Sequence, residues 1–241
     1  MINEYLKLFE MLKKIFKIVL WAIVVFFAGS VILVALYAFL PVPVTPHMLL
    51  RTAGGIFEGK FVGIDKDWVS YEEVSPHLFR AVIAAEDGRF MRHNGIDWKA
   101  VDAAKRYNER HKGKKKRGAS TITMQTAKNA FLPHWRNYIR KGIEVYYTYL
   151  IEAVWGKKRI LEVYVNIVEW GEGLYGAEAA AQKHFGKSAK DLTSREAALL
   201  AAVLPNPIRW SAGNPTPYIE KRASWVQGRM RGIAIPKKDK E

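Results

Sequence analysis

The chain has 241 residues, carries a formal net charge of +15 at pH 7 and contains no cysteine. Without cysteine, the sequence excludes a disulfide framework and a thiolate metal site. A strongly basic chain favours an anionic partner such as nucleic acid, a membrane surface or a phosphorylated lipid.

The N-terminal segment predicts a helix that crosses a membrane. Residues 1–17 are rich in lysine, the apolar stretch 18–40 follows with 23 residues, and the next charged residue is Arg51. A helix of this length spans the hydrocarbon core of a bilayer, which is roughly 30 Å thick. The apolar core of a signal peptide is shorter, with about 7–15 residues. We therefore expect an uncleaved, single-pass anchor.

The charges around this helix predict its orientation. Because the lysines precede the apolar stretch, the positive-inside rule keeps residues 1–17 in the cytoplasm. Residues 41–241 are then expected on the periplasmic side of the cytoplasmic (inner) membrane. Export disfavours nucleic acid as the anionic partner, and the anchor favours a partner at the membrane.

Residues 41–241 are numerous enough to form one domain with a hydrophobic core. We interpret residues 41–70 as a proline-rich linker and the start of this domain, with alternating apolar residues that favour a short hairpin or strand. From Ser75 and Pro76 onward, a cap followed by proline begins a helical pattern. The predicted helices cover about residues 76–90, 98–110, 119–130, 136–155, 158–169, 174–184, 194–203 and 216–230. The sequence thus predicts a mainly α domain at residues 71–241.

The stretch AAEDGRFMRHNGID (residues 84–97) places Glu86 and Asp87 at the end of an apolar run. If the helix continues, Glu86, Phe90 and His93 share one face through their i, i+4, i+7 spacing, while Asp87 points elsewhere. Burial beside an aromatic ring raises the pKa of a carboxylate, as a general acid or base requires near neutral pH. The alternatives are a structural polar pair of Glu86 and His93, or two acids that solvate a helix end.

The stretch GASTITMQTAKN (residues 118–129) contains a helix breaker, Gly118, and Ser120 as the expected N-cap. Thr121, Gln125 and Lys128 follow at i, i+4 and i+7, so one helix face presents a hydroxyl, an amide and an ammonium group. Donors near a helix N-terminus suit an anionic or polyhydroxyl ligand. An ordinary amphipathic helix would give the same pattern.

The stretch IRKGIEVYYTYLIE (residues 139–152) contains Arg140 and Glu144 at a spacing of i, i+4, which alone indicates a surface ion pair. Crowding by apolar and aromatic neighbours favours a second interpretation, a cleft shared by Lys141 and Lys128. Two carboxylates, Glu86 and Glu144, would then serve glycosyl chemistry, and the cations would hold a phosphate.

The sequence contains, in this order, the five segments EDGRFMRHNGID, GASTITMQTAKN, RKGIE, KKRILEVYVN and REAALLAAVLPNP. Together they resemble the motifs of the peptidoglycan glycosyltransferase family, which includes the polymerising domain of class A penicillin-binding proteins and the monofunctional transglycosylases. The resemblance covers roughly residues 70–210. It implies a mainly α, lysozyme-like globular domain with a small membrane-facing lobe, in which we expect Met124, Phe131, Leu132 and Trp135. No S-x-x-K or K-T-G motif follows, which favours the monofunctional members.

The resemblance also assigns roles to individual residues. Glu86 matches the catalytic base, and Glu144 matches the second acidic residue. Substrate binding is implied for ten residues of the first three motifs: Asp87, Phe90, His93, Ser120, Thr121, Gln125, Lys128, Asn129, Arg140 and Lys141. Glu162, Tyr164 and Asn166 match the fourth motif. No organic cofactor is implied, whereas a divalent cation (Mg²⁺ or Mn²⁺) supports some members, with Glu144 as the candidate ligand.

The implied activity is polymerisation of lipid II. β-1,4 bonds would form between the MurNAc of the growing chain (donor) and the GlcNAc of lipid II (acceptor), with inversion and release of undecaprenyl pyrophosphate. The implied partners are lipid II, the growing glycan and the membrane, together with other proteins of cell-wall synthesis or division. One alternative is a lysozyme-like or lytic enzyme, which needs no lysine–arginine cluster. Another is a membrane-anchored wall-binding scaffold, which needs no pair of carboxylates in separate motifs.

Overall fold

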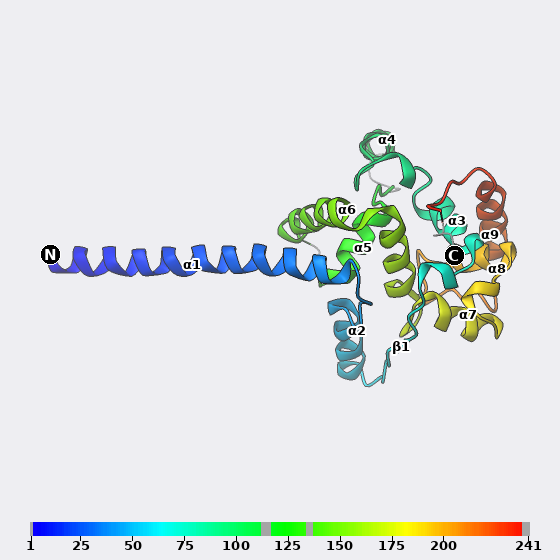
Figure 1. Cartoon of the computed structure of the whole chain (residues 1–241), viewed down its shortest axis with the longest axis horizontal. Helices are drawn as coiled ribbons and strands as arrows, with labels where there is room; N and C mark the ends of the chain where they lie inside the picture. The colour runs from blue at the N-terminus through cyan, green and yellow to red at the C-terminus, as the bar shows by residue number, and fades with distance from the viewer. Residues whose placement is uncertain (1, 112–116, 134–136, 238–241) are drawn as a thin grey trace. The chain divides into compact units, whose positions relative to one another are not determined.

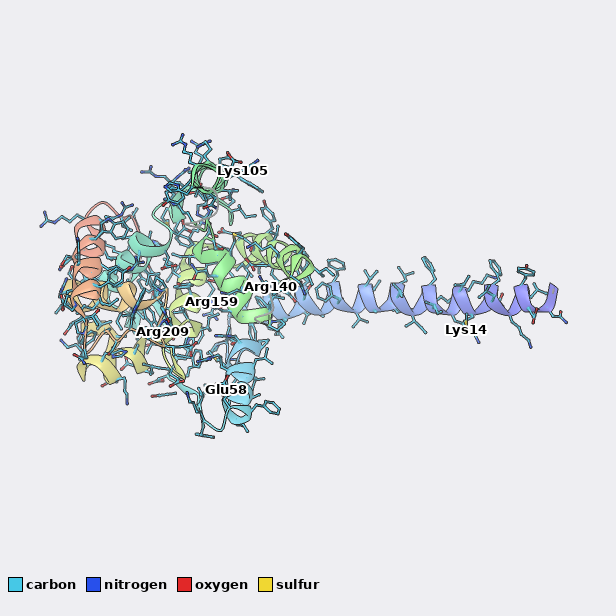
Figure 2. All side chains as sticks on the ribbon, turned by 180° about the vertical axis from the view of Figure 1, so that it is seen from behind. Lys14, Glu58, Lys105, Arg140, Arg159 and Arg209 are labelled. Atoms are coloured by element: carbon cyan, nitrogen blue, oxygen red, sulfur yellow. The ribbon has the colours of Figure 1, made fainter. Side chains whose placement is uncertain are left out.

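The computed structural model describes residues 2–111, 117–133 and 137–237, and the chain divides into two compact units, residues 1–40 and 41–241. The first unit is a single helix, α1 (Ile2–Tyr37), of 36 residues (Figure 1). It is long and apolar enough to cross a membrane, with a mean hydropathy of 2.8 over its most apolar window. Side chains project from all sides of α1, as seen around Lys14 in Figure 2.

The helix α1 extends further toward the N-terminus than the stretch 18–40 predicts. No proline or glycine interrupts residues 2–17, so the lysine-rich segment continues the helix. The helix ends at Tyr37 rather than at residue 40. Pro41 explains this end, because a proline disfavours helical geometry in the residue before it and cannot donate a backbone hydrogen bond.

The second unit is mainly α, as predicted, and its described residues include three short strands. Its helices are α2 (Pro46–Phe57), α3 (Pro76–Glu86), α4 (Trp98–Arg110), α5 (Ile122–Phe131), α6 (Tyr138–Ile167), α7 (Ala177–Phe185), α8 (Ser194–Val203) and α9 (Pro217–Met230). The strands are β1 (Asp65–Lys66), β2 (Glu169–Gly171) and β3 (Leu174–Tyr175), in the order β1-β3-β2. β1 pairs parallel to β3, and β2 pairs antiparallel to it.

The region 41–70 differs from its prediction in two ways. It contains α2, where the sequence predicts a linker: Thr45 caps this helix and Pro46 begins it. This is the same cap-and-proline signal that correctly predicts the start of α3 at Ser75 and Pro76. The strand β1 finds its partner in β3 instead of in a local hairpin, because the two segments are adjacent only in the folded domain.

Three further element boundaries differ from their predictions. α3 ends at Glu86 rather than near residue 90, because Asp87 adopts φ −156° and ψ 69°. α6 runs through the two helices predicted at 136–155 and 158–169, with a break at Gly156 (φ 66°, ψ 170°). α7 begins at Ala177, since the residues predicted to start it belong to β3.

The core brings together two groups of helices. α3 packs against α8 and α9, and α5 packs against α6 (Figure 1). Leu78, Phe79 and Val82 of α3 are fully buried, and α8 meets them with an alanine-rich face whose small side chains allow close approach. The C-terminal end of α3 and the N-terminal half of α5 therefore lie where the two groups meet.

Two of the four residues expected in a membrane-facing lobe are buried. Met124 and Leu132 are only 5% and 6% exposed, because α5 is packed against α6. The Phe131 ring stacks on Tyr147 at a centroid distance of 4.5 Å, and Trp135 lies outside the described residues. Met124 and Leu132 therefore belong to the packing between α5 and α6, and the membrane-facing lobe itself stays a prediction.

Large exposed apolar side chains occur instead on α2 and in the loop that follows it. Phe57 is 92% exposed and Phe61 is 88% exposed. Leu49 and Ile56 of α2 are also largely exposed. Contiguous exposed apolar side chains are typical of a surface that meets a membrane or a partner.

Candidate active site

Glu86 is the last residue of α3, and its side chain is partly buried where α3 meets α5. Its Oε2 accepts a hydrogen bond of 2.8 Å from Nε2 of Gln125. The other end of that amide is also held, since Oε1 of Gln125 accepts from the Tyr164 hydroxyl at 3.2 Å. Tyr164 and Gln125 thus fix the orientation of the amide that faces Glu86.

Burial raises the pKa of Glu86, as the sequence predicts. The Gln125 hydrogen bond and the positive charges of Arg222 and Lys128 oppose this rise, and the negative charge of Asp87 adds to it. The desolvation effect is the largest of these. Glu86 is therefore a better proton acceptor than an exposed glutamate. The positive charges of Arg222 and Lys128 still stabilise its ionised form.

His93 faces Asp87 rather than Glu86, with which the sequence predicts a shared helix face. Because α3 ends at Glu86, residues 90–92 form a short 3₁₀ helix, and His93 is turned toward Asp87. Nε2 of His93 lies 3.0 and 3.1 Å from the two carboxylate oxygens of Asp87, and the backbone N–H of Ile122 donates to Oδ2 at 3.1 Å. Asp87, rather than Glu86, therefore forms the polar pair with His93, and it holds the first residue of α5.

The second motif separates into exposed and buried residues. Ser120 is exposed and is not the N-cap; Thr121 caps α5 by accepting from the Met124 N–H at 3.1 Å. The buried Thr121 hydroxyl also donates to the carbonyl of Gly95. Asn129 is 6% exposed. Phe90, which the family resemblance assigns to substrate binding, is 0% exposed and belongs to the core.

Lys128 lies within electrostatic reach of both predicted carboxylates. Burial lowers the pKa of its ammonium group, and the charges of Glu144 and Glu86 act in the opposite direction. The positive charges of Arg140 and Lys141 lower its pKa further. The charges of the first and third motifs thus act on Lys128 of the second motif. A cleft shared by these residues stays a prediction.

Glu144 is not part of an exposed ion pair, because it is only 3% exposed. Nη1 of Arg140 lies 2.7 Å from its Oε2, and Nζ of Lys141 lies 2.5 Å from its Oε1. Figure 2 marks Arg140 on α6. Both carboxylate oxygens are thus occupied by cationic donors, an arrangement that aligns the two cations and disfavours a divalent metal at Glu144.

Asp87, His93 and Asp97 form a candidate metal-binding group, since each offers one ligand atom and these atoms lie within 4.8 Å of one another. Their fit to Mg²⁺ or Mn²⁺ is poor. Both carboxylate oxygens of Asp87 already have protein donors. Oδ1 of Asp97 accepts a hydrogen bond at the start of α4 and lies 3.4 Å from Nη1 of Arg89. A cation would have to displace these donors, and the arrangement favours a structural role for the group.

A cleft of about 360 Å³ opens beside Glu86, lined by Glu86, Asp87 and Ser120 and by two residues of α9, Trp225 and Arg229. The Arg229 guanidinium lies 4.7 Å from the Trp225 ring centroid. A larger cleft of about 720 Å³ lies at the other end of α3 and contains none of the predicted site residues. The smaller cleft therefore contains Glu86 but none of the cations Lys128, Arg140 and Lys141.

Sequence reasoning missed the contribution of α9. Arg222 acts on the charge of Glu86, and Trp225 and Arg229 line the cleft. Their spacing of three and four residues places them on neighbouring positions of one helix, which is the only sequence signal that could have indicated them.

The fourth motif mainly stabilises the fold. The Asn166 side chain pairs with both the N–H and the carbonyl of Val69, at 3.0 and 2.8 Å. Glu162 pairs with Arg159 at 2.6 Å. Of the three residues matched to this motif, Tyr164 is the one with a described bond to a site residue, Gln125.

The model of the transglycosylase family matches residues 57–231. Proteins named biosynthetic peptidoglycan transglycosylase are similar over most of their length. The protein from Rhodospirillum centenum is 54% identical over 213 residues, which cover 87% of this chain and 88% of the relative. The protein from Bdellovibrio bacteriovorus is 50% identical over 216 residues (90% and 85%), and that from Pseudomonas fluorescens is 48% identical over 220 residues (91% of each). The chain therefore belongs to the transglycosylase family, whose members are glycosyltransferases.

Proposed function

We propose that this protein polymerises lipid II into glycan strands, with Glu86 as the general base. One observation carries the proposal: a partly buried carboxylate with a raised pKa is held by Gln125 beside a cluster of cations. The relatives named biosynthetic peptidoglycan transglycosylase support the reaction class.

In this reaction Glu86 removes the proton from the 4-hydroxyl of the acceptor GlcNAc. The hydroxyl oxygen attacks C1 of the donor MurNAc at the end of the growing chain. The bond from C1 to undecaprenyl pyrophosphate breaks on the opposite face, so the α-linked donor yields a β-1,4 bond with inversion. A base near neutral pKa suits this step, because it must be ionised before the transfer and hold the proton after it.

The leaving pyrophosphate carries concentrated negative charge, and fixed cations stabilise such charge most effectively. Arg140 and Lys141 bind the carboxylate of Glu144, and Lys128 lies close enough for the charge of Glu144 to act on it. We assign the pyrophosphate to these three. Glu144 orients Arg140 and Lys141 rather than acting as a second base, because both of its oxygens already bind them.

The remaining predicted substrate-binding residues divide into two groups. Ser120 lines the cleft and is exposed, so it is placed to contact a sugar directly. Asp87 binds His93 and the Ile122 N–H, and Thr121 caps α5 and donates to the Gly95 carbonyl, so these residues position α5. Their contribution to binding is therefore indirect.

The apolar helix α1 is consistent with a single-pass anchor. We propose that its lysine-rich end lies in the cytoplasm and that residues 41–241 lie in the periplasm, where the lipid-linked substrate is available. Other proteins of cell-wall synthesis or division remain candidate partners.

The proposal is tested by incubating the full-length chain in detergent micelles with lipid II and separating the products by size. Wild-type protein and Glu58→Gln, a variant of the exposed glutamate that directly follows α2, should both form long glycan. Glu86→Gln should form glycan at a rate that is lower by roughly 10²–10⁴-fold. Shortening of added glycan strands would instead indicate the lytic activity, and the absence of any covalent product from wild-type protein would favour the scaffold.

A further inference from the structure

Lys157 and Glu152 form a buried ion pair next to the segments that carry Gln125 and His93. Nζ of Lys157 is 2.6 Å from Oε1 of Glu152, and the two side chains are only 18% and 9% exposed. The same ammonium group donates to the carbonyl of His93 at 2.7 Å and lies 4.5 Å from the Phe90 ring centroid. Lys157 therefore contacts both α6 and the loop that follows α3.

Glu152 extends this network to α5. Its Oε1 accepts a hydrogen bond of 2.6 Å from the hydroxyl of Thr123, a residue that is fully buried. Thr123 belongs to the first turn of α5, two residues before Gln125. The ion pair is thus connected on one side to the turn that carries Gln125 and on the other side to His93, the partner of Asp87.

The geometry of α6 makes this arrangement possible. Glu152 and Lys157 are five residues apart, whereas side chains of a regular helix meet at spacings of three and four. The break at Gly156, with φ 66°, turns the chain between them. This left-handed conformation favours glycine, and no atom lies within 4 Å of the position that a Cβ would take. The glycine is therefore required by the backbone conformation rather than by crowding.

We propose that Lys157 is a positioning residue for the transfer reaction: through Glu152 and His93 it fixes the two segments that hold Gln125 against Glu86. The proposal rests on the proposed function, in which Glu86 is the base. Lys157 has no contact with the cleft beside Glu86, so it acts on the rate through geometry and not through contact with substrate.

The role of Lys157 has to be separated from its contribution to stability. Lys157→Met alone would leave the buried Glu152 carboxylate without its cation, which destabilises a fold strongly. The double variant Lys157→Met/Glu152→Gln removes both charges and keeps a group that can bond to Thr123. Its melting temperature should therefore return close to that of wild type. The bond to the His93 carbonyl is not restored in the double variant.

The test compares kcat and KM for lipid II polymerisation in the full-length protein. The double variant should melt like wild type and show a kcat that is lower on the order of ten-fold, as expected for loss of one buried hydrogen bond to a charged group, with unchanged KM. Lys158→Met is the matched control, because the neighbouring Lys158 pairs with the more exposed Glu72 at 2.7 Å. It should leave both constants unchanged.

A folded double variant with the kcat of wild type would overturn the proposal, and so would a change confined to KM. If the double variant does not fold, Thr123→Val tests the same connection without altering a charge: kcat should fall and KM should not. Failure of this proposal is distinguishable from failure of the proposed function. An active Glu86→Gln protein contradicts the function itself, whereas an inactive Glu86→Gln with unaffected Lys157 and Thr123 variants contradicts only the positioning role.

Discussion

Gln125 donates a hydrogen bond of 2.8 Å to the carboxylate of Glu86 from a position 39 residues further along the chain. Tyr164 fixes the same amide from α6, so three helices meet at one carboxylate. This relationship explains how a partly buried glutamate with a raised pKa is kept in a single orientation. It also separates Glu86 from its neighbour Asp87, which is used to bind His93 and the start of α5.

Glu86→Gln should give a folded protein whose polymerisation rate falls by roughly 10²–10⁴-fold, because shape is kept while the base is lost. Asp87→Asn should act differently, by lowering both the melting temperature and the rate, since Asp87 holds His93 and Ile122. Rates with lipid II and melting curves for both variants check this. A folded Glu86→Gln protein with near wild-type activity would contradict the assignment of the base.

The raised pKa of Glu86 predicts opposite effects of pH on activity and on stability. The rate should rise with pH through the raised pKa, because the base must be ionised. Burial disfavours the ionised form of Glu86, so the folded state binds the proton more tightly than the unfolded state. The free energy of unfolding therefore falls as pH rises from the pKa of the unfolded state, about 4.3, to the raised pKa of the folded state. Glu86→Gln should therefore melt higher than wild type at neutral pH. The difference should vanish near pH 4, and a constant difference across this range would be inconsistent with a raised pKa.

Lys128→Ala and Arg140→Ala should each slow polymerisation by about ten- to a hundred-fold, the effect of losing about 1.5–3 kcal/mol from a charge-assisted contact to phosphate. Both variants should also bind a pyrophosphate-mimicking inhibitor more weakly. Arg140→Ala should lower the melting temperature as well, because it removes one partner of the buried Glu144. Retained inhibitor affinity in both variants would remove the proposed role of the cations.

Gly95→Ala should destabilise the fold by about 1–3 kcal/mol. Gly95 has φ +85°, and an added Cβ would lie 2.8 Å from Cγ2 of Thr148 and 3.1 Å from Cγ of Glu152. Gly142→Ala is the matched control, because Gly142 is helical and has open space around it. It should stabilise the fold by about 0.5–1 kcal/mol. Urea unfolding of the two variants measures both effects, and equal stabilities would show that the loop around Gly95 adapts.

Removal of residues 1–40 should preserve the chemistry and weaken activity on full-length lipid II in vesicles, because both substrates lie in the bilayer. A short-chain, water-soluble analogue of lipid II should restore the rate. Phe57→Ser/Phe61→Ser in the truncated protein should reduce vesicle binding further, since these two side chains are almost fully exposed. Truncated protein that binds no vesicles and still polymerises full-length lipid II at the rate of the whole chain would exclude this membrane role.

The sequence by itself determined the features that depend on local signals. The apolar stretch predicted a helix able to cross a membrane, and Ser75 with Pro76 predicted the start of α3, because caps and apolar periodicity act within a few residues. The same signal at Thr45 and Pro46 begins α2. Five motifs in order were sufficient to predict the family.

The tertiary structure decided which of the candidate residues face one another. The pairing of Asp87 with His93, the burial of Glu144 and the contribution of Trp225 and Arg229 could not be read from spacing along the chain. Each depends on where a helix ends or on how α3, α5, α6 and α9 pack. Periodicity fixes the face of a helix on which a side chain lies, but the desolvation and the charges that set its chemistry come from the elements packed against that face.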